Sequence, residues 1–130
     1  MPAPLIAVVD DDVALRQALV GLFASAGYAA LGYASAEAFL AARCAARCMV
    51  LDSNLPGMSG PELLRRLRAA GDFVPVIMIT GRGADELEVA RALQSGAAAW
   101  LCKPFAGEEL LGVVRRAIRG AMRTRQPKVQ

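Results

Sequence analysis

Residues 48–60 read CMVLDSNLPGMSG, a short apolar run that ends in one acid and then breaks into a turn. The run Met49–Leu51 is typical of a strand that is buried on both faces of a parallel sheet. Asp52 follows it directly, and Pro56, Gly57 and Gly60 mark the next residues as a loop. Ligands of open α/β sheets bind at the carboxyl ends of strands. Asp52 is therefore either a residue that starts a loop through bonds to nearby backbone or part of a functional site.

Four further apolar runs, at residues 5–9, 28–34, 76–79 and 97–102, are also predicted to be strands. Polar groups follow three of them. Asp10, Asp11 and Asp12 come after the first run, Thr80 after the fourth and Lys103 after the fifth. Because parallel strands end at the same edge of a sheet, these groups are expected to gather at the edge where Asp52 lies.

A helical pattern follows each predicted strand. Asp12 and Ser35 are expected to cap the first two helices, and Ser59 with Glu62 matches a capping box for the third. The expected inner faces are Leu15, Leu19, Leu22 and Ala26 in the first helix, Ala38, Phe39 and Ala42 in the second, Leu63, Leu64 and Leu67 in the third, Leu87, Ala90 and Leu93 in the fourth, and Leu111, Val114, Ile118 and Ala121 in the fifth.

Five strand–helix units in one chain imply parallel strands joined by right-handed crossovers. The predicted fold is α/β, a doubly wound five-stranded parallel sheet with five helices in a three-layer sandwich. In the strand order 2-1-3-4-5, the first and third strands are neighbours. The carboxylates that follow these two strands then converge.

The composition limits the class of protein. The chain has 130 residues, of which 55% are hydrophobic and 21% charged, and this excludes a disordered chain. No apolar run approaches the roughly 18 residues of a membrane span, and the N-terminus lacks the basic start of a signal peptide. Three cysteines without histidine fit a reducing compartment and argue against zinc at Cys44 and Cys48. We expect a cytoplasmic protein without a membrane association.

The net charge of +3 belongs to the C-terminal end of the chain. From Arg115 onward there are basic residues and no acid, whereas the preceding part is net acidic. The cations either complement the dipole of the last helix or, less directly, mark contact with nucleic acid. We expect one domain over residues 1–121, followed by a basic, flexible tail or the start of a linker over residues 122–130.

Three converging carboxylates need a cation, because each pair at about 4 Å repels by roughly 1–4 kcal/mol in an effective dielectric of 80 to 20. Carboxylate oxygens without Cys or His ligands favour Mg²⁺, for which Mn²⁺ can substitute. The hydroxyl of Thr80 and the charge of Lys103 suit the oxygens of a phosphoryl group. Asp52 can then act as the nucleophile that receives this group.

The strings VVDDD, VLDSNLPGMSG, MITG and LCKPF stand in the order and at the spacing of a known family. Over residues 4–121 the sequence resembles a response-regulator receiver domain of two-component signalling. The triple Asp and the MITG string resemble most closely the regulators of the FixJ type. The resemblance implies that such a chain catalyses its own phosphorylation and dephosphorylation and is not an enzyme acting on a separate substrate.

The resemblance also implies residue roles. Asp52 is the expected phospho-acceptor, with Thr80 and Lys103 binding the phosphoryl group. The expected metal ligands are Asp10, Asp11, Asp52 and the backbone carbonyl of Asn54. A cis peptide bond is expected between Lys103 and Pro104, and Thr80 and the residue at position 100 are expected to form the switch.

The resemblance further implies partners. The phosphoryl donor is a sensor histidine kinase, a phosphotransfer protein or a small phosphodonor. The surface of the fourth helix, fifth strand and fifth helix is expected to carry the signal, with a phosphorylation-dependent homodimer as one outcome. Nucleic acid is expected to be bound only through an output domain, which this sequence does not include, so that a stand-alone receiver and a fragment both remain open.

Two features depart from the family pattern. Position 100 usually holds Tyr or Phe and here is Trp100, which is either a switch residue or an ordinary amphipathic surface residue. The turn Gly81-Arg82-Gly83 after Thr80 is unusually rich in glycine and carries a cation beside the site.

Other interpretations of these residues remain. A haloacid-dehalogenase-like phosphatase also forms an aspartyl phosphate with Mg²⁺, but its signature needs Thr or Val where Ala14 stands. A flavodoxin-like binding module without phosphorylation would leave the acids, Thr80 and Lys103 without a role. Asp12 is interpreted as a helix cap and not as a ligand, and Met78 and Cys102 are expected in the core.

Overall fold

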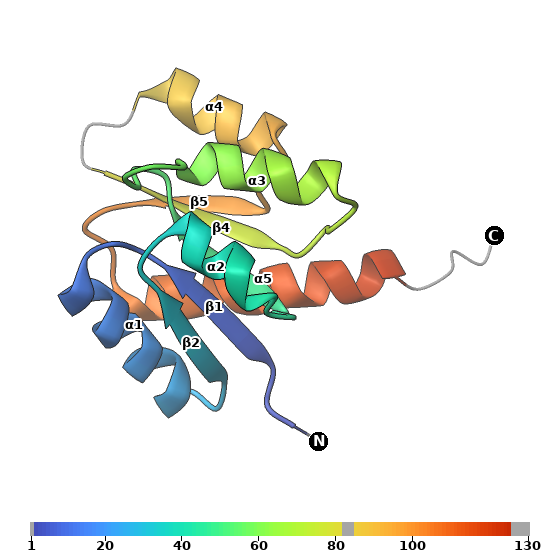
Figure 1. The fold of residues 1–130 in the computed structure, drawn as a ribbon. Helices are drawn as coiled ribbons and strands as arrows, with labels where there is room; N and C mark the ends of the chain where they lie inside the picture. The colour runs from blue at the N-terminus through green and yellow to red at the C-terminus, as the bar shows by residue number, and fades with distance from the viewer. Residues whose placement is uncertain (1, 82–84, 126–130) are drawn as a thin grey trace.

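The computed structural model describes residues 2–81 and 85–125, which form a three-layer α/β sandwich (Figure 1). The strands are β1 (Leu5–Val9), β2 (Ala29–Tyr33), β3 (Cys48–Asp52), β4 (Val76–Thr80) and β5 (Ala99–Cys102). The helices are α1 (Val13–Ser25), α2 (Ala36–Ala42), α3 (Gly60–Ala69), α4 (Glu86–Gln94) and α5 (Gly107–Arg125). All strand pairs are parallel, in the order β2-β1-β3-β4-β5. The predicted fold class and strand order are confirmed.

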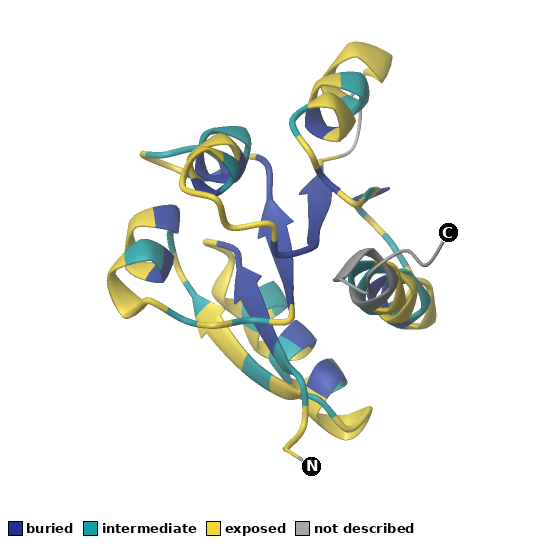
Figure 2. Ribbon diagram, turned by 90° about the vertical axis from the view of Figure 1, so that its right-hand side faces the viewer, coloured by how far each residue is buried: buried dark blue, intermediate teal, exposed yellow. Residues whose placement is uncertain are grey.

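The sheet separates two hydrophobic clusters. Helices α2, α3 and α4 cover one face through side chains that include Phe39, Leu63 and Ala92. Helices α1 and α5 cover the other face, where Phe23 and Leu110 are fully buried. Figure 2 shows the central strands as the most deeply buried part of the molecule. A strand with a helix layer on each side has no solvent-facing side, and for this reason β3 and β4 are apolar in nearly every position.

The predicted helix starts are confirmed at three caps. The side chains of Asp12, Ser35 and Ser59 each accept a hydrogen bond from the backbone N–H three residues later. Helix α4 has an equivalent cap at Asp85 that the sequence did not single out. Each cap satisfies one of the N–H groups that a helix start leaves without an intrahelical partner.

The inner faces of the helices are predicted less well. Ala26, Ala38 and Ala42 are exposed, whereas Phe23 and Ala36 are buried. A short helix that is rich in alanine and leucine carries apolar residues on several sides, and only the sheet decides which side is buried.

Helix α4 shows the largest difference. Leu87 and Leu93 are 57% and 44% exposed, although the spacing predicted them on the inner face. Only Ala92 of this helix is buried, with Val89 and Ala90 partly so. The helix lies over the edge of the sheet at β5, so the sheet covers a narrow stripe of it.

The C-terminal part of the chain is helical beyond residue 121. Helix α5 continues to Arg125, and the boundary of the domain at residue 121 stays a prediction. Residues 126–130 lie outside the described residues, so the flexible tail stays a prediction. Arg82 and Gly83 of the glycine-rich turn also lie outside them. Within the described part of the chain, no helix combines the length and the apolar character needed to cross a membrane.

Candidate functional site

Three carboxylates meet at the carboxyl ends of β1 and β3. Asp10 directly follows β1, and Asp52 is the last residue of β3, its neighbour in the sheet. One carboxylate oxygen from each of Asp10, Asp11 and Asp52 lies within 4.8 Å of the others. Asp10 and Asp52 are 2% and 4% exposed, whereas Asp11 faces solvent. The structure thus brings together the three acids that the sequence singled out.

Lys103 is the cation of this cluster. Its Nζ lies 3.4 Å from Asp52 Oδ2 and 3.6 Å from Asp10 Oδ2. The backbone N–H of Lys103 donates to the carbonyl of Thr80 at 2.8 Å and fixes where the side chain begins. Partial burial lowers the pKa of the Lys103 ammonium, but the charges of Asp52 and Asp10 outweigh burial and raise it. The peptide bond between Lys103 and Pro104 is cis, as the resemblance implied.

The environment of Asp10 favours a neutral group or a bound cation. Burial raises the pKa of the Asp10 carboxyl, and the charges of Asp52 and Asp11 raise it further. The N–H of Asp12, at 2.9 Å from Asp10 Oδ1, and the charge of Lys103 lower it. The rise prevails because burial, which disfavours the charged form, is the largest of these influences. With three carboxylates and one ammonium, the site carries two uncompensated negative charges when all the acids are ionised.

The loop after β3 is held close to Asp52. The N–H of Asn54 donates to Asp52 Oδ1 at 3.0 Å, which orients the carboxylate. The N–H of Met58 donates to Glu37 Oε2 of α2 at 3.1 Å, and this bond lowers the pKa of the Glu37 carboxyl. Sequence reasoning missed Glu37, since the bond joins residues 21 positions apart and no local pattern marks it.

Thr80 is buried at the end of β4, and its hydroxyl donates to the carbonyl of Leu101 on β5 at 3.3 Å. The structure therefore places Thr80 beside the cluster in the sheet without an interaction with the carboxylates. At this length the bond is weak. Rotation of the hydroxyl toward an anion on Asp52 would therefore lose little hydrogen-bond energy.

Trp100 lies on β5 opposite Met78 and is 40% exposed. It borders a cavity of about 410 Å³ between α4 and the ends of β4 and β5, lined by Thr80, Asp85, Glu86, Val89, Ala90, Leu93, Trp100 and Cys102. Cys102 is exposed, so its predicted place in the core is wrong, whereas Met78 is fully buried as predicted. β5 is an edge strand, and on the side of α4 the residues 100 and 102 face an unfilled space.

The carboxylates fit Mg²⁺ in chemistry and nearly in geometry. Mg²⁺ binds oxygen ligands at about 2.0–2.1 Å, so two ligands on opposite sides of the ion are roughly 4.2 Å apart. The oxygens of Asp10, Asp11 and Asp52 span up to 4.8 Å, which a small inward movement would close. The two uncompensated negative charges match the charge of the ion.

Comparison with known proteins agrees with this geometry. Residues 6–115 match the family model of the response regulator receiver domain. Over 131 aligned positions the chain is 38% identical to response regulator protein TodT of Pseudomonas putida strain F1, covering 98% of this chain and 57% of TodT. It is 42% identical over 130 positions to transcriptional regulatory protein FixJ of Azorhizobium caulinodans, covering 97% of this chain and 61% of FixJ. The chain thus spans less than two thirds of the length of these curated relatives.

Solved structures give the same result. The chain superposes on the response regulator StyR with a TM-score of 0.86 at 37% identity, over 95% of this chain and 63% of StyR. It superposes on FixJ-N with a TM-score of 0.83 at 32% identity, over 99% of this chain and all of that one. The resemblance seen in the sequence is confirmed: this chain belongs to the family of response regulator receiver domains, the phospho-accepting modules of two-component signalling.

Proposed function

We propose that this receiver takes a phosphoryl group onto Asp52 in a reaction that requires Mg²⁺ or Mn²⁺. The donor is the phosphohistidine of a sensor kinase or phosphotransfer protein, or a small phosphodonor. The observation that carries the proposal is the position of Lys103, whose Nζ lies between the two buried carboxylates of Asp10 and Asp52. From this position the Lys103 ammonium can pair with the negatively charged oxygens of a phosphoryl group on Asp52.

In the proposed reaction, a carboxylate oxygen of Asp52 attacks the phosphorus atom. The bond from phosphorus to the donor nitrogen or oxygen breaks, and its electron pair leaves with the donor. Asp10, Asp11, Asp52 and the carbonyl of Asn54 would hold the metal, which when bound neutralises charge on the phosphoryl oxygens. Lys103 and Thr80 bind these oxygens, Thr80 after its hydroxyl leaves the carbonyl of Leu101. Water later attacks the same phosphorus, the bond from phosphorus to the Asp52 oxygen breaks, and inorganic phosphate leaves while the carboxylate is restored.

The proposed switch is the movement of Thr80 together with Trp100. The cavity beside Trp100 is about 410 Å³, well above the space that one indole ring needs. As Thr80 moves toward the phosphoryl group, the ring can turn into this cavity. That would change the surface of α4, β5 and α5, where Leu87 and Leu93 are exposed. We assign partner binding or homodimer formation to this surface.

The test is mass spectrometry after incubation with acetyl phosphate. We expect one phosphoryl group per chain, located to the peptide that contains Asp52, and no labelling in EDTA. Labelling that EDTA leaves unchanged would contradict the metal requirement. Rapid turnover of a small phosphate ester would favour a phosphatase, and a complete lack of labelling would favour a binding module.

Replacing Asp11 by asparagine is expected to raise the melting temperature in EDTA and to abolish stabilisation by Mg²⁺. The variant removes one of three like charges, and the gain is on the order of 1 kcal/mol because Asp11 is exposed. Thermal melts in EDTA and in Mg²⁺ measure both effects. Asp12→Asn is the matched control, since asparagine caps α1 equally well. An Asp11→Asn variant that melts lower than wild type in EDTA would show that other contacts satisfy the acids.

Tryptophan emission should change when beryllofluoride and Mg²⁺ are added. Trp100 is the only tryptophan of the chain, so the signal reports its environment alone. Burial of the ring in the cavity beside Thr80 is expected to shift the emission to shorter wavelength, and Asp52→Asn should abolish the shift. A spectrum that stays fixed while mass spectrometry shows full phosphorylation would identify Trp100 as a static surface residue.

A further inference from the structure

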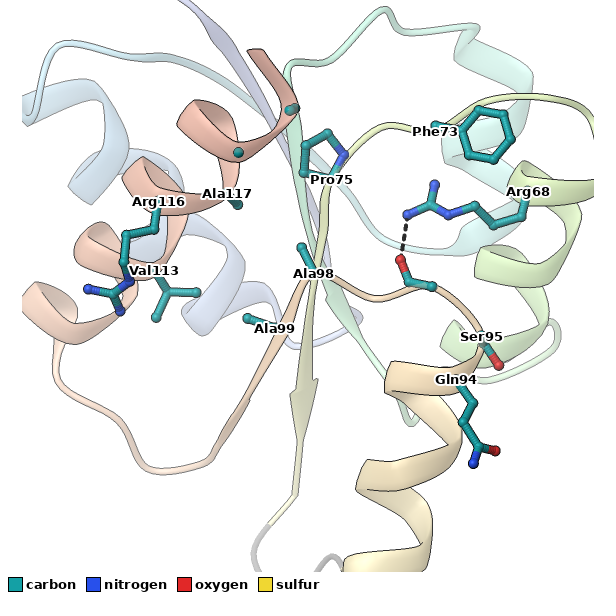
Figure 3. Close-up of a pocket in the computed structure, with 13 residues that line it drawn as sticks. Arg68, Phe73, Pro75, Gln94, Ser95, Ala98, Ala99, Val113, Arg116 and Ala117 are labelled. Carbon is teal, nitrogen blue, oxygen red and sulfur yellow. Dashed lines mark hydrogen bonds between the residues drawn. The ribbon is translucent and has the colours of Figure 1, made fainter. Parts of the chain in front are cut away.

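A second and larger cavity lies at the opposite end of the sheet from Asp52. Its volume is about 710 Å³, within the range of about 300–1,000 Å³ in which small-molecule sites fall. Figure 3 shows it between α5 on one side and the ends of α3 and α4 on the other. Its residues come from the segments that enter β4 and β5, from the first residue of β5, from the C-terminal ends of α3 and α4 and from α5, and none of them belongs to the phosphorylation site.

The floor of the cavity is apolar and made of small side chains. Pro75 and Ala98 come from the segments that enter β4 and β5, and Ala99 is the first residue of β5. Val113 and Ala117 of α5 form one wall (Figure 3). Small side chains on both sides leave the space between helix and sheet open where larger ones would fill it. Such a floor accepts the apolar body of a ligand.

The walls carry positive charge. The thirteen lining residues include Arg68 and Arg116 and no acid. Within the described part of the chain, the ion pairs are those of Lys103 with Asp10 and Asp52. No carboxylate there lies within ion-pair distance of the Arg68 or Arg116 guanidinium. Asp72 acts on Arg68 only at longer range. Figure 3 shows the two arginine side chains on opposite sides of the cavity, with the Arg116 guanidinium directed away from it and against Gly112, which is not a lining residue. A cavity that the Arg68 guanidinium faces and that has no lining acid is complementary to an anion.

Arg68 is held in place ready for such a contact. Its Nη1 donates to the carbonyl of Asp72 at 3.0 Å. Its Nη2 donates to the carbonyl of Gly96 at 2.8 Å, the bond drawn in Figure 3. Its Cζ lies 6.0 Å from the ring centre of Phe73. A guanidinium has five N–H donors, so two bonds to neutral carbonyls fix its position without neutralising its charge. Burial lowers its pKa, which shows that the charge is partly desolvated.

Phe73 completes the rim. It is 71% exposed, more than any other large hydrophobic side chain whose exposure the structure describes, and it stands beside Arg68 at the mouth of the cavity. An aromatic ring at the edge of an apolar floor offers a surface on which a second ring can stack. An apolar floor, an aromatic rim and the guanidinium of Arg68 are together the features of a site for an amphipathic anion.

We propose that this cavity, lined by Arg68 and Phe73 over an alanine-rich floor, binds a small organic anion with an apolar or aromatic body. Its carboxylate lies toward Arg68 and its apolar body over Ala98 and Ala117. The inference does not depend on the phosphorylation of Asp52, and its test uses no phosphodonor.

The experiment is a titration of ¹⁵N-labelled protein with 4-phenylbutyrate, followed by NMR. 4-Phenylbutylamine has the same apolar body with the charge reversed and serves as the matched probe. We expect saturable shifts at the amides of Gly96, Ala98 and Ala117 with the carboxylate, none at Asp52, and weaker or no shifts with the amine. Equal binding of both probes, or shifts without saturation, would overturn the proposal.

Three variants locate the site. Arg68→Gln is expected to weaken binding of 4-phenylbutyrate about fivefold, the fold-change that a partly exposed ion pair contributes. Arg65→Gln removes another arginine of α3, which does not line the cavity, and should leave the affinity unchanged. Ala117→Phe should fill the space beside α5 and abolish binding, and circular dichroism should show an intact fold for all three.

Equal weakening by both arginine variants would mean that only the general charge of α3 attracts the anion, and the proposal would fail. Saturable binding of an acidic, aromatic hexapeptide without binding of 4-phenylbutyrate would assign the cavity to a protein partner and overturn the small-molecule proposal.

Discussion

Asp52→Asn is expected to reduce covalent labelling by acetyl phosphate to background. The amide is nearly isosteric with the carboxylate, and its oxygen can still accept the bond from the N–H of Asn54. The fold should therefore persist. The amide nitrogen lacks the negative charge that attacks phosphorus, and the site loses one of its three candidate metal ligands. Intact-protein mass spectrometry measures the loss, with circular dichroism as the test of folding.

Asp12→Asn is the matched control for this prediction. Asp12 follows the same cluster of acids, but its side chain accepts from the N–H of Leu15 as the cap of α1 and does not belong to the cluster. Its labelling should equal that of the wild type. Undiminished labelling of Asp52→Asn, or an equal loss in Asp12→Asn, would refute the assignment of Asp52 as the phospho-acceptor.

Gly60→Ala is expected to destabilise the fold by about 2–3 kcal/mol, or roughly 8–15 °C in melting temperature. Gly60 is the first residue of α3 and packs against the backbone that follows β3. A Cβ there would meet the carbonyl oxygen of Asp52, and it would lie 2.8 Å from the Cα of Ser53 and 3.0 Å from the carbonyl carbon of Asp52. Backbone atoms cannot yield as a flexible side chain can, so α3 or the loop must move. Thermal and denaturant unfolding measure the cost.

Gly21→Ala provides the opposite result for the same substitution. Gly21 lies within α1, and a Cβ there would meet nothing within 4 Å. Alanine should therefore stabilise the protein by about 0.5–1 kcal/mol, because glycine loses more backbone entropy in a helix. If both variants were equally stable, the close approach at Gly60 would have no energetic consequence. We also expect Gly60→Ala to slow labelling of Asp52, since the shifted loop carries Asn54.

The residues of the site could be predicted because they end buried strands. A strand covered on both faces is a continuous apolar run, so the first polar residue after it marks the edge of the sheet, as with Asp10, Asp52 and Thr80. The placement of Lys103 beside the acids follows from the same pattern once the strand order is known.

Other features depend on how surfaces meet, which a local pattern does not contain. Spacing alone does not show which side of α4 packs on the sheet. Leu87 and Leu93, which were predicted to face inward, are exposed. Cys102 is apolar enough for a core but lies on an edge strand beside a space that nothing fills. The bond between Glu37 and Met58 and the cavity near Arg68 join segments far apart in the sequence.

The pairing of β5 with β4 has a consequence during protein synthesis. The lysine of the site lies at position 103, and its backbone is fixed to Thr80 only after the last strand has joined the sheet. Asp10 and Asp52 leave the ribosome long before this partner. A nascent chain, or one cut before residue 103, would hold its acids without the ammonium between them. Under the proposed function, phosphorylation of Asp52 is therefore expected only in copies in which β5 has joined the sheet.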